Sequence, residues 1–199
     1  MGNGGRAAVP ASVEAGYDAL SLEERALAWI EPYWNADHLV RTRDWLVELD
    51  PGAGEAARLA ALTHDIERHF PGGPVQDLAV WPEGESEYRR LHSERSAQIV
   101  GDWLRDEWAG DELVADVERL IVAHEVGGEP DEDLIQAADS LSFLEVNPKV
   151  LAGWYTSGRA SKERAKAQGQ WMFERIKIGR ARELARPLYE EAIAVVDRA

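Results

Sequence analysis

The sequence predicts an all-α fold, and three observations point to it. Apolar residues recur at helical spacing through most of the 199 residues. No strand-like alternation of apolar and polar residues extends over five or more positions. Pro- and Gly-rich breaks separate the helical segments, and no repeat at a fixed period is present.

Capping residues and helix breakers divide the chain into its expected helices. Ser21 followed by Glu24 is a capping-box pattern that starts the first helix. On similar start and stop signals, the next five helices are expected over about residues 35–50, 54–70, 83–108, 111–125 and 131–147. After Pro148 the pattern resumes in one or two longer helices. Pro187 is expected to start the last helix, because proline fits the first turn.

Length and composition are those of a soluble globular chain, with 45% hydrophobic and 30% charged residues. We expect a flexible N-terminus over residues 1–19, a helical domain over 20–150 and basic helices over 151–199 packed on the same domain. The chain has no cysteine, which excludes disulfides and thiolate ligands. No apolar run reaches the roughly 20 residues of a membrane helix. The N-terminus lacks a signal peptide, so we predict a cytoplasmic protein.

Charge is unevenly distributed along the chain. The formal net charge of -15 makes binding to nucleic acid or to an anionic membrane unexpected, because both would be repelled. Residues 159–186 reverse this balance with a net charge of +6. Such a segment can bind an anionic substrate, dock on the acidic surface of its own chain or form a solvated helix face. The charge pattern leaves these three interpretations open.

Four histidines fall on four different predicted helices: His38, His64, His92 and His124. Each lies beside an apolar stripe; His124, for example, follows Leu120 by four residues and so shares its buried face. Burying several imidazoles costs free energy unless each has a partner. A shared metal ion would supply that partner and would explain why the four side chains converge.

Two carboxylates strengthen the prediction of a metal site. Asp65 directly follows His64, and Asp139 lies among small apolar residues, where an ionised aspartate needs a partner. Imidazole and carboxylate without thiolate favour iron, manganese, zinc, nickel, cobalt or magnesium. Glu67 and His69 fall out of phase with His64, and His69 is expected at the surface or in a loop.

The order of His38, then His64-Asp65, then Asp139 resembles the signature of the HD-domain superfamily. In that family each of these elements lies on a separate helix of an all-α bundle. The resemblance covers about residues 20–150 and includes the apolar run that leads into the His-Asp pair. It implies an HD-domain helical bundle, with a C-terminal helical extension, in which these four residues bind a metal ion.

His92 and His124 match two histidines that a subgroup of HD proteins inserts between the His-Asp pair and the last aspartate. There they bind a second metal ion, and by this resemblance Asp65 would bridge the two ions. The alternative is a single ion, with these two histidines supporting its ligands or binding substrate. We therefore expect one or two divalent transition-metal ions (iron, manganese, zinc, nickel or cobalt), with magnesium as a further option.

Two metal ions a few ångströms apart suit phosphoryl chemistry, because they activate water and stabilise charge on phosphoryl oxygens. We expect Asp65 and Arg68 to be catalytic, since one helical turn places Arg68 beside the metal. Trp81 and Trp154 are candidates for lining a pocket or stacking on a base. Four further basic residues are candidates for holding the remaining phosphates: Arg95, Lys162, Lys166 and Arg175.

The resemblance implies a metal-dependent phosphohydrolase acting on a nucleotide, a dinucleotide polyphosphate or another small phosphate ester. The chain lacks the glutamate-aspartate pair that follows the motif in (p)ppGpp hydrolases and the Gly-Tyr-Pro elements of cyclic-di-GMP phosphodiesterases. One alternative is an HD-type diiron oxygenase that cleaves a C–C or C–P bond. Another is a non-catalytic, ligand-sensing HD protein. The expected partner is a small phosphorylated substrate, with no nucleic acid and no membrane.

Overall fold

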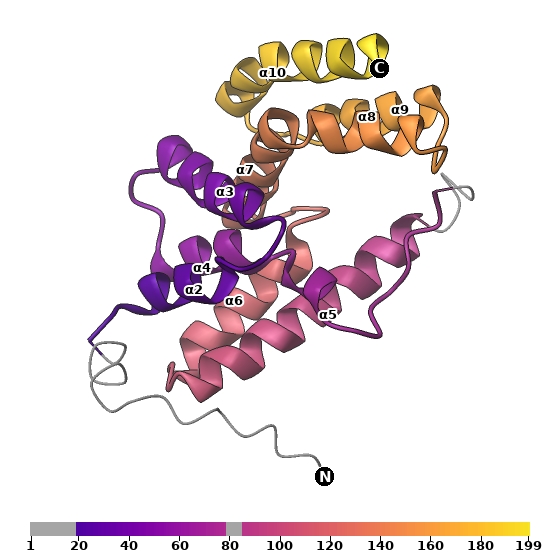
Figure 1. Ribbon diagram of the computed structural model, residues 1–199. Helices are drawn as coiled ribbons and strands as arrows, with labels where there is room; N and C mark the ends of the chain where they lie inside the picture. The colour runs from indigo at the N-terminus through magenta and orange to yellow at the C-terminus, as the bar shows by residue number, and fades with distance from the viewer. Residues whose placement is uncertain (1–18, 79–84) are drawn as a thin grey trace.

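The computed structural model describes residues 19–78 and 85–199, and all regular secondary structure in these ranges is helical (Figure 1). This confirms the predicted all-α class. The described residues form nine α-helices and one short 3-10 helix. Trp81 and nearly all of the predicted N-terminal segment lie outside the described residues.

The helices follow one another through short connections. The first four elements are α2 (Leu22–Ile30), α3 (Ala36–Leu49), α4 (Glu55–Thr63) and the 3-10 helix η1 (Ile66–His69). The next three are α5 (Glu85–Asp106), α6 (Asp111–Ala123) and α7 (Pro130–Val146). The last three are α8 (Pro148–Thr156), α9 (Lys162–Glu174) and α10 (Gly179–Arg198). Among the described residues, no helix combines the length and apolar character that a membrane span requires.

Capping side chains fix several helix starts. The predicted capping box at α2 is present, because the Ser21 hydroxyl accepts a hydrogen bond from the Glu24 amide and the Glu24 carboxylate accepts one from the Ser21 amide. Ser161 caps α9 in a similar way by accepting a hydrogen bond from the Arg164 amide. Pro130 occupies the first turn of α7, where its missing N–H leaves no hydrogen bond unmade.

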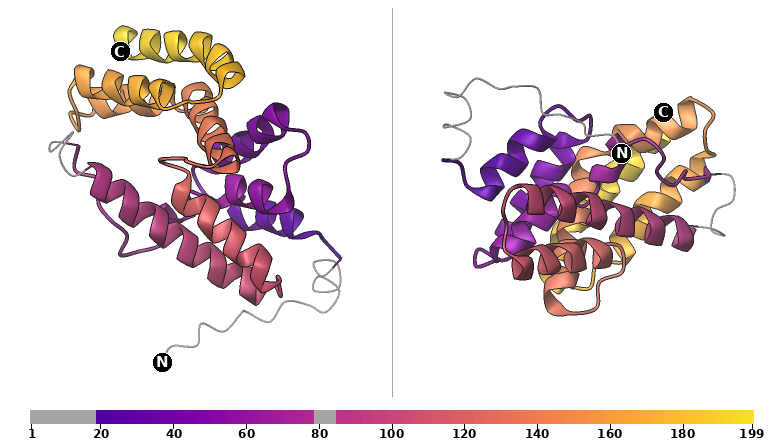
Figure 2. Two further views of the ribbon diagram at one scale, coloured as in Figure 1. Left: turned by 180° about the vertical axis from the view of Figure 1, so that it is seen from behind. Right: turned by 90° about the horizontal axis from the view of Figure 1, so that it is seen from below.

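Helix α7 lies at the centre of the bundle and packs closely on α3. Helices α5 and α6 form a hairpin at one end of the molecule, while α8, α9 and α10 gather at the other end (Figure 1; Figure 2). One hydrophobic cluster joins these parts, since it contains Leu46 of α3, Leu141 of α7, Val100 of α5 and Ala185 of α10. The small residues at positions 137–140 allow neighbouring helices to approach α7 at the level of Asp139.

Two predicted helix boundaries are wrong. The helix expected over 54–70 ends at Thr63, and the chain turns at His64 before the short η1 helix. It ends there because the His64 imidazole, rather than a backbone amide four residues on, takes up the carbonyl of Ala61. Pro187 does not start the last helix but lies inside α10 on its exposed face, where water can replace the backbone hydrogen bond that proline removes.

Candidate metal centre

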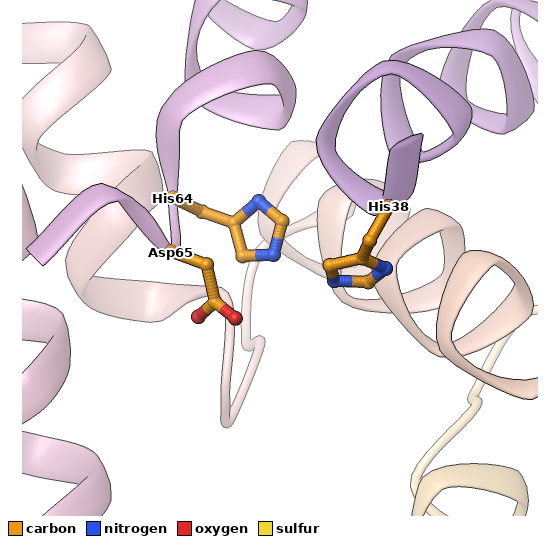
Figure 3. A group of neighbouring side chains, drawn as sticks. All are labelled: His38, His64 and Asp65. Atoms are coloured by element: carbon orange, nitrogen blue, oxygen red, sulfur yellow. The ribbon is translucent and has the colours of Figure 1, made fainter. Parts of the chain in front are cut away.

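Six predicted ligands from five helical segments meet in the interior of the bundle. His38 projects from α3, His64 and Asp65 follow the end of α4, His92 lies on α5, His124 follows the end of α6, and Asp139 lies on α7. Figure 3 shows the side chains of His38, His64 and Asp65 turned toward one another. Potential ligand atoms lie within 4.8 Å of one another in three overlapping groups: His38, His64 and Asp65; His64, His124 and Asp139; and Asp65, His92 and His124.

Two of the histidines terminate the helices that carry them. The Nδ1 atom of His64 donates to the carbonyl oxygen of Ala61 at 3.1 Å, and that of His124 donates to the carbonyl oxygen of Ile121 at 2.6 Å. Carbonyls in the last turn of a helix lack the amide partner four residues on, so the imidazoles take up this role, at Ile121 together with the His124 amide at 3.4 Å. The C-terminal ends of α4 and α6 therefore both face the centre, and their partial negative charge favours a cation there.

The other two histidines are held by side chains. The Nδ1 atom of His38 donates to the Ser142 hydroxyl at 2.8 Å, and this hydroxyl in turn donates to the His38 carbonyl. The Nδ1 atom of His92 donates to the Glu67 carboxylate at 2.8 Å. All four imidazoles thus use Nδ1 for an anchoring hydrogen bond and turn Nε2 toward the centre. Metal-binding histidines show this arrangement, in which the second ring nitrogen donates to a carbonyl, hydroxyl or carboxylate.

The Nε2 atom of His64 is the clearest sign that a cation fits this centre. It is buried and has no hydrogen-bond partner among the described residues. It lies 3.4 Å from an Asp139 carboxylate oxygen, and the Nε2 atom of His38 lies 3.2 Å from the same oxygen. Burial acts to lower the pKa of His64, but Asp139 outweighs it and raises that pKa, so the metal-free centre attracts a proton here. A metal ion bound between these imidazoles and Asp139 would take the place of that proton.

Each aspartate of the centre is held by an arginine. Arg175 binds one Asp139 oxygen and also donates to Glu125 at 2.6 Å, while Arg68 donates to an Asp65 oxygen at 2.9 Å. Burial alone would raise the pKa of Asp139, but Arg175 and His64 hold that pKa well below its usual value. In the same way Arg68 and His92 hold the pKa of Asp65 well below its usual value despite burial. Both carboxylates are therefore ionised and each presents its second oxygen to the imidazoles.

Two histidines of the centre have opposite acid-base properties in the metal-free protein. Burial lowers the pKa of His124 to about 4, so this imidazole is neutral at pH 7. Burial and Arg68 also act to lower the pKa of His92, but Asp65 and Glu67 outweigh them and raise it to about 9. The Nε2 atom of His92 lies 2.6 Å from an Asp65 oxygen, with a proton between them. A metal ion binding at this position must displace that proton.

The predicted basic residues lie in different surroundings. Arg68 contacts Asp65, and Arg175 contacts Asp139, so both belong to the centre. Arg95 instead donates to the Pro71 carbonyl at 2.7 Å. Lys162 and Lys166 contact Asp197 on α10. Much of the basic segment thus docks on acidic groups of its own chain, and the assignment of these residues to substrate stays a prediction.

Residues that contact the ligands of the centre but were not predicted as site residues include Glu67, Tyr88 and Ser142. Glu67 is 3% exposed and anchors His92. The Tyr88 ring stacks on the His92 ring, and its hydroxyl accepts a hydrogen bond from Arg68 at 2.7 Å. The spacing of four residues between Tyr88 and His92 on one helix face was the available signal. No sequence signal pointed to Glu67, because the turn after Asp65 breaks the helical spacing that relates Glu67 to His64.

His69 was expected at the surface or in a loop, and it keeps partial exposure at the surface. It is half-buried in η1, stacks on Tyr33 with ring centroids 3.9 Å apart, and donates from Nε2 to the Asn35 side chain at 2.5 Å. The 3-10 helix causes this, since its tighter winding turns His69 back toward the start of α3.

A cavity of about 100 Å³ adjoins the centre. His38, Asp65 and Asp139 lie at its inner side, and Trp154 lines it as predicted. The rest of its wall is mainly aromatic and amide side chains, which include Trp34, Phe143, Trp171, Asn35, Gln76, Asn147 and Gln168. A small molecule that enters this cavity therefore reaches the candidate ligands directly.

Comparisons with protein-family models, with curated proteins and with solved structures found no match to this chain. Membership of the HD-domain superfamily therefore stays a prediction from the order and spacing of the ligands. What the structure shows is an all-helical fold with a buried cluster of histidines and aspartates suited to a metal ion.

Proposed function

We propose that this chain is a metal-dependent phosphohydrolase of the HD-domain superfamily that acts on a nucleotide or another small phosphate ester. The observation that carries the proposal is the buried, unpartnered Nε2 atom of His64, a residue that belongs to two of the three groups of potential ligands. These histidines and aspartates would hold a divalent transition-metal ion, or a pair of ions, which would supply a Lewis acid that activates water and neutralises phosphoryl charge. Imidazole and carboxylate ligands suit iron, manganese, zinc, nickel or cobalt.

The chain's own residues contribute a rigid frame for this chemistry. Arg175 fixes one oxygen of Asp139 and leaves the other turned to the centre, while Arg68 donates to both oxygens of Asp65, at 2.9 and 3.4 Å. Ligands fixed in this way need little reorganisation as charge develops during the reaction. Arg68 lines the cavity as well as holding Asp65, so its guanidinium is placed to contact a phosphoryl oxygen of the substrate.

Tyr88 is placed to donate a proton or a hydrogen bond. Its oxygen accepts a hydrogen bond from Arg68, which leaves its own O–H for an acceptor in the cavity that it lines. Burial raises the pKa of Tyr88 to about 12, although Arg68 opposes this, and the hydroxyl therefore stays protonated at neutral pH. We propose that it donates to a phosphoryl oxygen or to the leaving-group oxygen.

The test is a screen of phosphorylated metabolites for inorganic phosphate release by protein loaded with each candidate metal. Metal-stimulated release is expected, and His64→Ala and Asp65→Ala should abolish it. Glu94→Ala, which changes an exposed residue that pairs with Arg90, is the matched control and should retain it. Turnover that survives both site substitutions would contradict the proposal. Oxygen uptake measured in parallel distinguishes the diiron oxygenase alternative, which predicts substrate-dependent uptake without phosphate release.

A further inference from the structure

The charges on the cavity wall limit which phosphate esters fit it. Two arginines line the cavity, and both are already paired: Arg68 with Asp65 at 2.9 Å and Arg89 with Glu85 at 3.2 Å. Three carboxylates also line it, those of Asp65, Glu125 and Asp139, and no lysine does so among the described residues. A chain of phosphates needs cationic partners for each additional phosphoryl group. Beyond the proposed metal centre, the described part of this wall offers only Arg89, whose charge is already matched by Glu85.

Aromatic side chains make up much of the remaining wall. Trp34 is 67% exposed and Val150 is 39% exposed, although both are large apolar residues, and both line the cavity. Trp154 and Trp171 also contribute to its lining. Exposed apolar surface at a cavity is typical of a binding site for an apolar part of a ligand. The body of the substrate is therefore expected to be uncharged and partly apolar.

Asn35 supplies an unused hydrogen-bond donor in the same wall. Its side-chain oxygen accepts a hydrogen bond from His69, which fixes the orientation of the amide group. An amide oxygen can only accept, so the Asn35 Nδ2 atom and its two hydrogens remain available as donors. This Nδ2 atom is buried without a partner, in a residue that is 4% exposed. Buried donors without partners are rare because they cost free energy, and a ligand oxygen would recover that cost.

We propose that the substrate is a phosphate monoester with an uncharged, partly apolar body, and that Asn35 donates a hydrogen bond to one of its oxygens. The phosphate part of this inference rests on the proposed function. The apolar wall and the Asn35 donor do not, because they concern recognition rather than turnover. Trp34 covers the body of the substrate at the rim, and His69 acts as a positioning residue that keeps the Asn35 amide turned to the cavity.

Binding of three probes tests the substrate class: phenyl phosphate, methyl phosphate and inorganic tripolyphosphate. Each is titrated into metal-loaded protein by calorimetry with the free metal concentration held constant. Phenyl phosphate should bind about tenfold more tightly than methyl phosphate, because only its ring can contact the aromatic wall. Tripolyphosphate should bind no more tightly than methyl phosphate. Preference for tripolyphosphate over phenyl phosphate would overturn the proposal.

Two exposed tryptophans provide a matched pair of variants. Trp34→Ala should reduce phenyl phosphate affinity about tenfold and leave methyl phosphate affinity unchanged, since it removes only the contact with the ring. Trp108→Ala is the control, because Trp108 is 92% exposed and is not part of the cavity wall. It should alter neither affinity. Equal effects of the two substitutions on phenyl phosphate would contradict the role of Trp34.

Asn35→Asp tests the donor, with Asn147→Asp as its control. The first substitution keeps an acceptor for His69 but removes the donor, while the second adds the same charge to the same cavity. Asn35→Asp should weaken methyl phosphate binding at least tenfold more than Asn147→Asp does, with unchanged thermal unfolding of both proteins. Equal weakening would mean that added charge alone is responsible, and the Asn35 assignment would be wrong.

Binding and turnover separate this inference from the proposed function. Phosphate release from phenyl phosphate is measured in the same preparations. The predicted order of binding without any phosphate release would contradict the hydrolase proposal and leave the recognition inference standing. Phosphate release with the reverse order of binding would support a hydrolase and overturn the inference about its substrate.

Discussion

The two aspartates of the centre lie in contrasting surroundings. Asp139 is 7% exposed in its side chain and its partner Arg175 is 6% exposed, whereas the corresponding values are 14% for Asp65 and 28% for Arg68. We call Asp139, Arg175, His38 and the residues that hold them the Asp139 end, and Asp65, Arg68, His92 and their partners the Asp65 end. The enclosed Asp139 end is suited to holding an ion permanently. Both ends contribute residues to the cavity, but the Asp65 end is the more exposed of the two and is therefore suited to contact with substrate.

The anchoring of the imidazoles follows the same division. At the Asp139 end His38 donates to a neutral hydroxyl, that of Ser142, while at the Asp65 end His92 donates to the carboxylate of Glu67. A charged acceptor makes an imidazole more basic and a stronger ligand. The two ends therefore should differ in stability, in pH dependence and in metal affinity.

The largest expected difference concerns the two arginines. Arg175→Met should lower the free energy of unfolding of the metal-free protein by about 3 kcal/mol or more, because it leaves Asp139 and Glu125 as buried carboxylates without a guanidinium. Arg68→Met should cost no more than about 1 kcal/mol, because that ion pair is partly solvated. Urea denaturation measures both. Equal losses would contradict the difference in burial between the two ends.

A pH effect of similar size should distinguish His92 from His124. The folded pKa of His92, about 9, exceeds the ordinary value of about 6.5, so its contribution is complete below pH 6.5 and disappears as the pH rises to 9. The folded pKa of His124, about 4, is below the ordinary value, so stability falls as the pH drops from 6.5 to 4. Each of these two pH-dependent losses lowers the free energy of unfolding by about 3 kcal/mol.

Substitutions in the metal-free protein test which histidine causes each loss of stability, the one above pH 6.5 (the alkaline limb) and the one below it (the acid limb). His92→Gln should flatten the alkaline limb of the unfolding free energy, and His124→Gln should flatten the acid limb. The measurement is the urea midpoint as a function of pH. Because the pKa of His64 is also raised, part of the alkaline limb should remain, but an alkaline limb of unchanged size in His92→Gln would show that the Asp65–His92–Glu67 contact does not hold a proton.

Metal affinity should show the smallest of these differences. Glu67→Gln should weaken binding at the Asp65 end about tenfold to a hundredfold, because His92 loses its charged anchor. Ions bound at the Asp139 end should keep their affinity. Competition with a chelator measures both affinities, and Glu94→Gln on the exposed face of α5 is the control. Loss of all metal from Glu67→Gln would contradict the separation of the centre into two ends.

The helical fold and the meeting of the six side chains were accessible from the sequence for a physical reason. Helical periodicity records which face of each helix is buried, and the four histidines lie on such faces or directly after them. The helix end at His64 was not accessible. Hydrogen bonding of its side chain to the Ala61 carbonyl, rather than any Pro or Gly, ends α4 there.

The partners of the ligands were less predictable because they depend on contacts between distant segments. Arg175 was expected to hold substrate, and no sequence signal showed that it also lies against Asp139 of α7 and Glu125 after the end of α6. Glu67 reaches His92 only because the 3-10 helix replaces the expected α-helix. Asn35 gave no signal at all, since its role depends on its contact with His69. Side-chain pairings of this kind follow from the packing of whole helices rather than from local pattern.

The most direct test of the metal centre is the metal content of the purified protein after incubation with divalent transition metals and removal of the excess. Wild-type protein should retain one or two ions per chain, and His69→Gln, which changes the histidine outside the cluster, should retain the same number. His64→Ala should lose most of the bound metal while keeping its helical circular dichroism. Wild-type protein without bound metal, or His64→Ala with the full complement, would contradict a metal centre at these residues.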